Sequence, residues 1–129
     1  MVDIIYEDVS IGTPDVRVKG MAHYPIVINQ RVPGNLFFEE KTYYLFGFFA
    51  PNDSNERAIR IIVRTERPPP NLVSYENMTI EGHISFPNQD KVPFETEIEL
   101  GKKTAYFFID EMLLLEPTKI TVDDDVWTP

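Results

Sequence analysis

Two segments in the second half of the chain alternate between apolar and polar residues, and this pattern constrains the fold more than any other feature. Residues 78–86 (MTIEGHISF) and residues 92–100 (VPFETEIEL) place apolar side chains at every second position. Successive side chains of a β-strand point to opposite faces of the sheet, so each segment is predicted to be a strand with one buried face. The sequence shows no sustained helical period. We therefore expect an all-β domain.

Apolar runs elsewhere predict the other strands. Residues 42–49 (TYYLFGFF) are apolar almost throughout, which is typical of a strand that is buried on both faces or that curls, with Gly47 at a bend. Residues 58–66 alternate, so Ile61 and Val63 are expected on the core face. Further strands are predicted at residues 16–20 and 26–30 and, with a kink or as two strands, at 104–116. About seven to nine short strands in total favour a barrel or a sandwich.

The length of 129 residues suits a single domain with one core, so residues 1–129 are expected to form one unit. Within it, residues 1–14 are predicted to be an N-terminal arm or edge strand, and residues 118–129 an acidic C-terminal tail. A shift of 36 residues matches nine of 27 positions between residues 26–52 and 62–88. Either a duplication or the shared order of strand, turn and strand explains this match.

No apolar run approaches the roughly 18 residues that a membrane helix needs, so a soluble protein is expected. The compartment stays open: it is cytoplasmic or, where a signal or anchor was removed, extracytoplasmic. The chain has no cysteine, which excludes disulfides and thiolate ligands.

Arginines gather in one predicted strand of an acidic protein. Four of the 12 basic residues fall between positions 57 and 67. Arginines that follow a phosphate backbone, with aromatic rings as stacking platforms, are what single-stranded nucleic acid binding requires. The candidate ligand-binding residues are therefore Arg57, Arg60, Arg64 and Arg67, with Tyr43, Tyr44 and Tyr75 as aromatic neighbours and His83 on an outward-facing strand position.

The same arginines have a structural interpretation, which we prefer. Glu95, Glu97 and Glu99 share one face of a predicted strand, and they can neutralise Arg60 and Arg64 across neighbouring strands. A net charge of −9 also repels nucleic acid. The preferred function is therefore a non-enzymatic binding or assembly module, and its ligand stays open. Single-stranded nucleic acid binding is the alternative function, and the partner is either nucleic acid or a protein. Self-association is compatible with either function.

Catalytic and metal-binding patterns do not emerge from the sequence. The chain has two histidines on different predicted strands and six glycines, and it contains no nucleophile elbow or phosphate-binding loop. We therefore expect no catalytic residues, no metal site and no cofactor, and an enzyme or metal binder built on carboxylates ranks last among the functions.

The end of the chain resembles the C-terminal tip of single-stranded-DNA-binding proteins. The residues DDDVWTP combine Asp123, Asp124 and Asp125 with the aromatic Trp127. In that family the tip recruits partner proteins, so the resemblance makes these four residues candidates for partner binding. The chain departs from the pattern because Thr128 and Pro129 follow the tryptophan.

Residues 62–116 resemble the OB domain of the periplasmic haem chaperone of cytochrome c maturation. The matching residues are Val63, Pro70, Leu72, Ile80, Glu81, Gly82 and the run Asp110-Glu111-Met112-Leu113. Glu116 lies where that family has its haem-attaching histidine, so covalent haem binding is not implied.

From this resemblance we expect an OB-like β-barrel with an N-terminal extension, and an antiparallel β-sandwich is the alternative. Residues 42–49 would be the first barrel strand and residues 58–66 the second, with the first 40 or so residues as the extension.

Overall fold

The computed structural model describes residues 1–22, 28–32, 41–51, 58–67, 77–85 and 107–128. Among these residues the single helical element is a 3-10 helix of 3 residues, η1, and no helix there is long and apolar enough to cross a membrane. The elements are β1 (Val2–Ile4), η1 (Tyr6–Asp8), β2 (Asp15–Ala22), β3 (Ile28–Val32), β4 (Lys41–Phe49), β5 (Ala58–Thr65), β6 (Asn77–Ser85), β7 (Phe107–Val122) and β8 (Asp125–Trp127).

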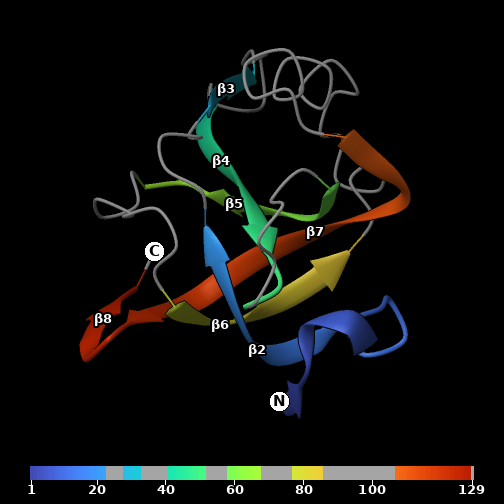
Figure 1. The fold of residues 1–129 in the computed structure, drawn as a ribbon. Helices are drawn as coiled ribbons and strands as arrows, with labels where there is room; N and C mark the ends of the chain where they lie inside the picture. The colour runs from blue at the N-terminus through green and yellow to red at the C-terminus, as the bar shows by residue number, and fades with distance from the viewer. Residues whose placement is uncertain (23–27, 33–40, 52–57, 68–76, 86–106, 129) are drawn as a thin grey trace.

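Strands β2, β6, β7, β5 and β4 pair in that order and form a closed barrel (Figure 1). The ring closes where β4 returns to β2 through the antiparallel pairs Met21–Phe49 and Ala22–Phe48. The other neighbours are also antiparallel, except that β5 and β7 run parallel. Because one continuous ring takes the place of two stacked sheets, the barrel is confirmed and the sandwich alternative is wrong.

The first barrel strand is β2, which corrects the assignment of that segment to an N-terminal extension. Val16 and Val18 are fully buried, whereas Asp15 before them and Arg17 between them are exposed. Residues 41–49 are consequently the second barrel strand and residues 58–65 the third. The local pattern predicts a strand here, but the pairing of β2 with the distant β6 decides its place in the barrel.

Both ends of the chain are built into the sheet. At the N-terminus, β1 lies parallel to β2 at the sheet edge, and Tyr6 and Val9 enter the core. At the other end, residues 118–122 continue β7, and β8 folds back on β7. The segment expected as an acidic tail is therefore a hairpin. Trp127 there packs, partly buried, against the core.

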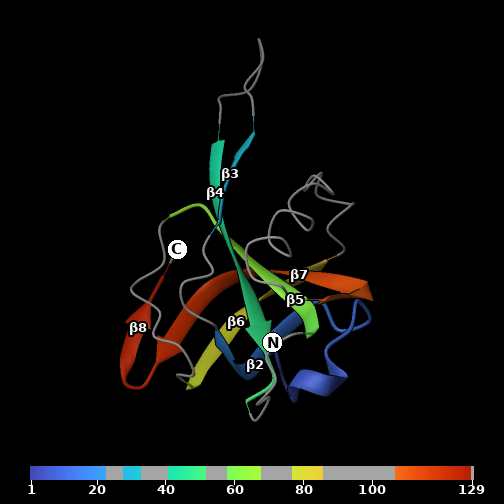
Figure 2. The same ribbon diagram turned by 45° about the horizontal axis from the view of Figure 1, so that its top comes forward.

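Strand β4 is longer than the barrel wall requires. Its first half pairs with β3, from Ile28–Leu45 to Val32–Lys41. Figure 2 shows the two strands rising together above the barrel. The second half of β4 pairs with β5 and so belongs to the wall.

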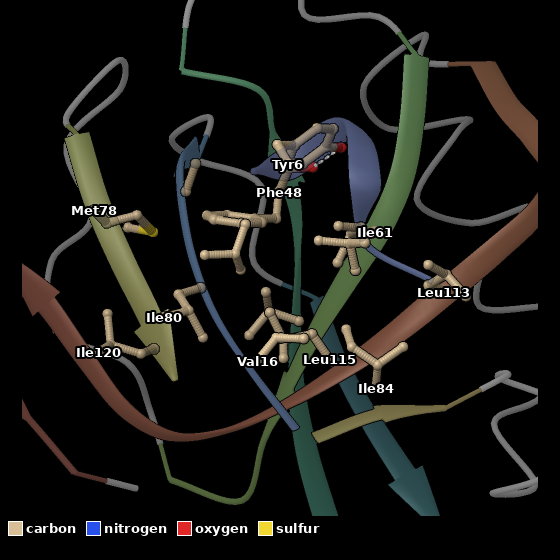
Figure 3. Packing of buried hydrophobic residues seen from close by; sticks show 14 of the residues in the cluster. Tyr6, Val16, Phe48, Ile61, Met78, Ile80, Ile84, Leu113, Leu115 and Ile120 are labelled. Atoms are coloured by element: carbon tan, nitrogen blue, oxygen red, sulfur yellow. Dashed lines mark hydrogen bonds between the residues drawn. The ribbon is translucent and has the colours of Figure 1, made fainter. Parts of the chain in front are cut away.

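A single cluster of apolar side chains from all five barrel strands fills the interior (Figure 3). Strand β6 alternates as predicted, with Met78, Ile80 and Ile84 buried inside. Strand β5 turns Ile61 and Val63 inward, also as predicted. The cluster consists of Tyr6, Val9, Val16, Val18, Ala22, Phe46, Phe48, Ile61, Val63, Met78, Ile80, Ile84, Leu113, Leu115 and Ile120.

A second set of apolar side chains is buried on the outer side of the barrel wall. Leu45, Ile62 and Leu114 alternate along their strands with members of the inner cluster, yet each is at most 1% exposed. The register places Ile62 between Gly47 and Leu114. Burial on both faces explains why residues 42–49 are so apolar, as the sequence predicted.

Strand β7 bends around the barrel at a bulge opposite Gly82. Glu81 pairs with Lys119 and Gly82 pairs with Pro117, so Thr118 is an extra residue in β7. The Thr118 hydroxyl donates a hydrogen bond of 3.1 Å to the Glu81 carbonyl. A bulge sharpens the local twist and bends its strand, which lets β7 follow the barrel wall.

Candidate functional site

Arg64 is built into the outer face of the barrel wall. It lies opposite Leu45 of β4, and only 8% of its surface is exposed. The guanidinium carbon lies 4.6 Å from the centre of the Tyr43 ring, and Nη2 lies 3.0 Å from Oε2 of Glu116. These contacts join β4, β5 and β7. The remaining donor, Nε of Arg64, is buried without a hydrogen-bond partner among the described residues.

Replacing Arg64 with alanine is expected to lower the free energy of unfolding by about 1–3 kcal/mol. Removing one member of a buried ion pair costs about 3–5 kcal/mol, but the Glu116 side chain is 39% exposed and can recover hydration. Urea denaturation followed by circular dichroism measures the change. The control is Arg17→Ala, because Arg17 pairs with carboxylates on the surface. Equal midpoint shifts in both variants would contradict a special role for Arg64.

Arg60 is directed to the N-terminal segment. Its Nη1 donates a 2.6 Å hydrogen bond to the Tyr6 carbonyl, its Nη2 donates to the Val9 carbonyl, and its guanidinium lies 5.9 Å from the Tyr6 ring centre. The Tyr6 hydroxyl in turn donates to the Phe48 carbonyl at 2.7 Å. Arg60 therefore satisfies two carbonyls of the segment around η1 and holds it against the barrel.

Arg67 is directed to the C-terminal hairpin. Its Nη1 donates a 2.9 Å hydrogen bond to the Thr128 carbonyl, and its guanidinium lies 5.8 Å from the Trp127 ring centre. The three described arginines of the cluster thus have three different sets of partners within the chain.

The acidic residues of the expected tail lie at the tip of this hairpin. Asp123 and Asp124 form the turn between β7 and β8, and Asp123 has a φ of 53°, in the left-handed region that Asp tolerates. Asp125 starts β8 opposite Val122. All three aspartates are exposed, while Trp127 is only partly accessible.

The remaining candidate residues are dispersed. Tyr44 is half-buried and pairs with Thr65. His83 is exposed, and its Nδ1 lies 3.5 Å from a carboxylate oxygen of Asp15. Arg57 and Tyr75 lie outside the described residues, as do Glu95, Glu97 and Glu99, so the predicted neutralisation of arginines by this glutamate ridge stays a prediction. Among the described residues, no group of three or more side chains could hold a metal ion.

A groove of about 470 Å³ lies on a different part of the surface, beside β1, η1 and the residues that follow β4. Its apolar lining comes from Ile4, Ile5 and Tyr6 on one side and from Pro51 after β4. Ile5 is 63% exposed although it is a large apolar residue. The other lining residues are Asp3, Glu7, Arg17, Lys19 and Thr79. The sequence did not predict this groove, because segments that are far apart in the chain form it.

An ion-pair network begins at two lining residues of the groove, Asp3 and Arg17. Arg17 contacts Asp3 at 3.1 Å and Glu81 at 3.0 Å, and Lys119 contacts Glu81 at 3.5 Å. Hydrogen bonds to Glu81 and then to Asp3 raise the pKa of Arg17. The hydrogen bond from Arg17 is the main cause that lowers the pKa of Glu81. Both groups therefore stay charged around neutral pH.

Three other lining residues have no such partners. Lys19, Glu7 and Thr79 make no side-chain hydrogen bond or ion pair with any residue that the structure describes. Lys19 and Thr79 face each other as a register pair of β2 and β6. Directly opposed side chains of an antiparallel pair have Cβ atoms about 4.5–5.5 Å apart, so the Lys19 and Thr79 side chains start from neighbouring points beside the apolar lining.

Comparison with known proteins identifies the fold. No family model matches the sequence, and no curated protein matches it. Among solved structures, the barrel is similar to the OB domain of Ta0387 from Thermoplasma acidophilum, determined by NMR in solution. The TM-score is 0.57 at 14% sequence identity, and the match covers 97% of this chain and 90% of that domain. At this identity the likeness shows the fold alone, and it confirms the expected OB-like barrel.

Proposed function

We propose that this protein is a non-enzymatic binding module of the OB type and that its ligand is held in the groove between η1 and Pro51. The observation that carries the proposal is the groove itself, where Ile4, Ile5 and Tyr6 lie beside polar groups that have no partner among the described residues. Ligand sites are commonly concave and mostly apolar, with a few polar groups that orient the ligand. The volume of about 470 Å³ falls in the range of about 300–1,000 Å³ that such sites occupy.

The charged groups of the groove favour binding over catalysis. General acid–base catalysis works best when the pKa of the catalytic group lies near the working pH. The pKa of Arg17 is raised and the pKa of Glu81 is lowered. Both pKa values therefore move away from neutral pH, and both groups keep their charge. Arg17 lines the groove, and its ion pairs with Asp3 and Glu81 join β1, β2 and β6.

Neutral apolar probes test the groove directly. Addition of indole or 1-octanol to isotope-labelled protein is expected to shift the amide resonances of Ile4, Ile5, Lys19 and Thr79 in NMR spectra. Thr79→Phe, which places a ring in the groove, should weaken these shifts at least about fivefold, since it fills apolar volume that the probe needs. The matched control is Thr121→Phe, because Thr121 pairs with Thr79 on β7 but does not line the groove. Equal weakening by both variants, or shifts elsewhere, would contradict the proposal.

Single-stranded nucleic acid is the second candidate ligand, and two contacts favour it. Arg64 stacks on Tyr43, and Arg67 lies beside Trp127. Tyr43 lies on β4 and Arg64 on β5, which are the second and third strands of the barrel. OB folds bind oligonucleotides on the face formed by their second and third strands. This ligand ranks second because Arg64 is 8% exposed and already paired with Glu116.

A labelled oligo-dT titration separates the two ligands. We expect no binding even at low salt, because the protein carries a net charge of −9 and both arginines have partners within the chain. Fluorescence anisotropy at low and high salt is the measurement. Binding that weakens with salt and is lost in Tyr43→Ala and Arg67→Ala would establish the second candidate instead. For single strands, log K falls by about 0.7 per phosphate contact for each tenfold rise in salt concentration.

A further inference from the structure

We propose that the groove is a binding site for a small apolar carboxylate, a molecule with a hydrocarbon body and one carboxylate group. This inference rests on the proposed function, because it uses the same groove, and it adds the chemical class of the ligand. Lys19 supplies the cation, Thr79 supplies a hydroxyl beside it, and the apolar lining covers the hydrocarbon.

Lys19 provides the available positive charge. Arg17 also lines the groove, but it already contacts Asp3 at 3.1 Å and Glu81 at 3.0 Å. Its charge is therefore balanced within the protein. Lys19 has no carboxylate partner among the described residues, so an incoming anion does not have to displace an ion pair that the structure describes.

Thr79 adds a second donor at the same place. It is half-buried and pairs with Lys19 across β2 and β6, and its side chain makes no hydrogen bond with the described residues. Charge-assisted hydrogen bonds to a carboxylate are stronger than neutral ones. An ammonium and a hydroxyl on adjacent strands thus form a pair of donors suited to the two oxygens of one carboxylate.

The rest of the groove suits a hydrocarbon. Ile4, Ile5, Tyr6 and Pro51 line it, and covering the 63% exposed Ile5 would remove apolar surface from water. Each additional methylene of the ligand is expected to tighten binding about two- to fourfold while the groove still has room. The length of the hydrocarbon should therefore matter as much as its charge.

Glu7 allows a test of the direction in which charge changes the affinity for the ligand. Its exposed carboxylate also lines the groove and has no partner in the described part of the chain. It repels an anionic ligand, so removal of its charge should tighten binding, whereas removal of the Lys19 charge should weaken it. A purely apolar site would respond to neither change.

The test is a titration of labelled protein with sodium octanoate, butanoate and 1-octanol, followed by NMR. Octanoate is expected to shift the amide resonances of Ile4, Ile5, Lys19 and Thr79. It should bind at least about tenfold more tightly than butanoate, which has a shorter hydrocarbon, and at least about tenfold more tightly than octanol, which has no charge.

Variants then assign the charges. Lys19→Gln should weaken octanoate at least about tenfold, whereas octanol binding stays the same. Glu7→Gln should tighten octanoate by up to about fivefold. The matched control is Lys119→Gln, because Lys119 pairs with Glu81 but does not line the groove, and it should leave octanoate affinity unchanged.

The outcomes separate this inference from the proposed function. If octanol binds in the groove as tightly as octanoate, or Lys19→Gln leaves octanoate affinity unchanged, the carboxylate assignment is overturned while the groove remains the binding site. If no apolar probe shifts the groove resonances, both fail. Octanoate shifts that lie outside the groove also overturn the inference.

Discussion

Gly82→Ala is expected to destabilise the protein by at least about 2 kcal/mol. A Cβ atom at this position would lie 2.8 Å from Cα of Pro117 and 2.9 Å from the carbonyl carbon of Glu116, and it would also meet the Glu116 carbonyl oxygen. All three atoms belong to the backbone of β7 at its bulge, so no side-chain rotation relieves the contact. The methyl group must push β6 and β7 apart where β7 bends around the barrel.

Urea denaturation of the wild type and of Gly82→Ala measures this effect. The matched control is Gly12→Ala, because the atom nearest to a Cβ there is Oγ of Ser10, at an ordinary contact distance of 3.5 Å. We expect that control to change stability by less than about 1 kcal/mol. Equal stability of Gly82→Ala and the wild type would show that the two strands do not approach each other this closely.

Phe48→Ala is expected to cost about 3–5 kcal/mol, the range for removing a large aromatic side chain from a core. Phe48 is fully buried, and its ring centre lies 5.8 Å from that of Tyr6. It also pairs with Ala22 at the seam between β2 and β4 that closes the barrel. The substitution therefore leaves a cavity at this seam and removes the packing of the N-terminal segment.

The same urea titration, with circular dichroism as the signal, tests this expectation. Val126→Ala is the control, since Val126 is an apolar residue with 58% of its surface exposed, and we expect a change within about 0.5 kcal/mol. A loss below about 1 kcal/mol for Phe48→Ala would contradict the packing of this ring in the core.

The strands with strong local patterns could be predicted from the sequence. Alternation in residues 78–86 predicted both the strand and the burial of Ile80 and Ile84, because side chains on one face of a sheet share one environment. The apolar run at residues 42–49 predicted either burial on both faces or a curled strand, and Leu45 and Phe46, which point to opposite faces, are both fully buried. Ser85 is only 6% exposed although it pairs with Leu114, whose side chain is buried on the outer side of the wall, so the alternation predicted the face of Ser85 without its burial.

The order of the strands could not be predicted in full. Residues 16–20 read as a strand, but nothing in them specifies pairing with β6 or with the far end of β4. Pairing between distant segments depends on the whole chain, so β2 was placed in an extension although it is the first barrel strand. The resemblance to OB domains gave the barrel itself, without this register.

In the candidate site too, local features could be predicted from the sequence, whereas contacts between distant segments could not. The sequence correctly indicated that Arg60 and Arg64 belong to a strand and that Arg67 follows its end, but their partners come from elsewhere in the chain. Arg64 contacts Glu116, and Arg67 contacts Thr128, residues that are remote in sequence. The groove was missed because Lys19 and Thr79 meet only after β2 and β6 pair. The alternation of β6 did predict that Thr79 points outward, and this was the one available signal.

The position of β7 also determines how the chain can fold as it is synthesised. β7 pairs with β5, β6 and β8 and contributes Leu113, Leu115 and Ile120 to the core, yet it is made after the other four barrel strands. Until it arrives, β5 and β6 lack a neighbour on one side, and unpaired strand edges invite contact with other chains. Residues 1–106, which are made before β7, carry 15 acidic and 11 basic residues, and this net charge of −4 makes nascent chains repel one another during the interval. Because β7 is made last of the barrel strands, we infer that the negative charge of the chain reduces aggregation before the barrel can close.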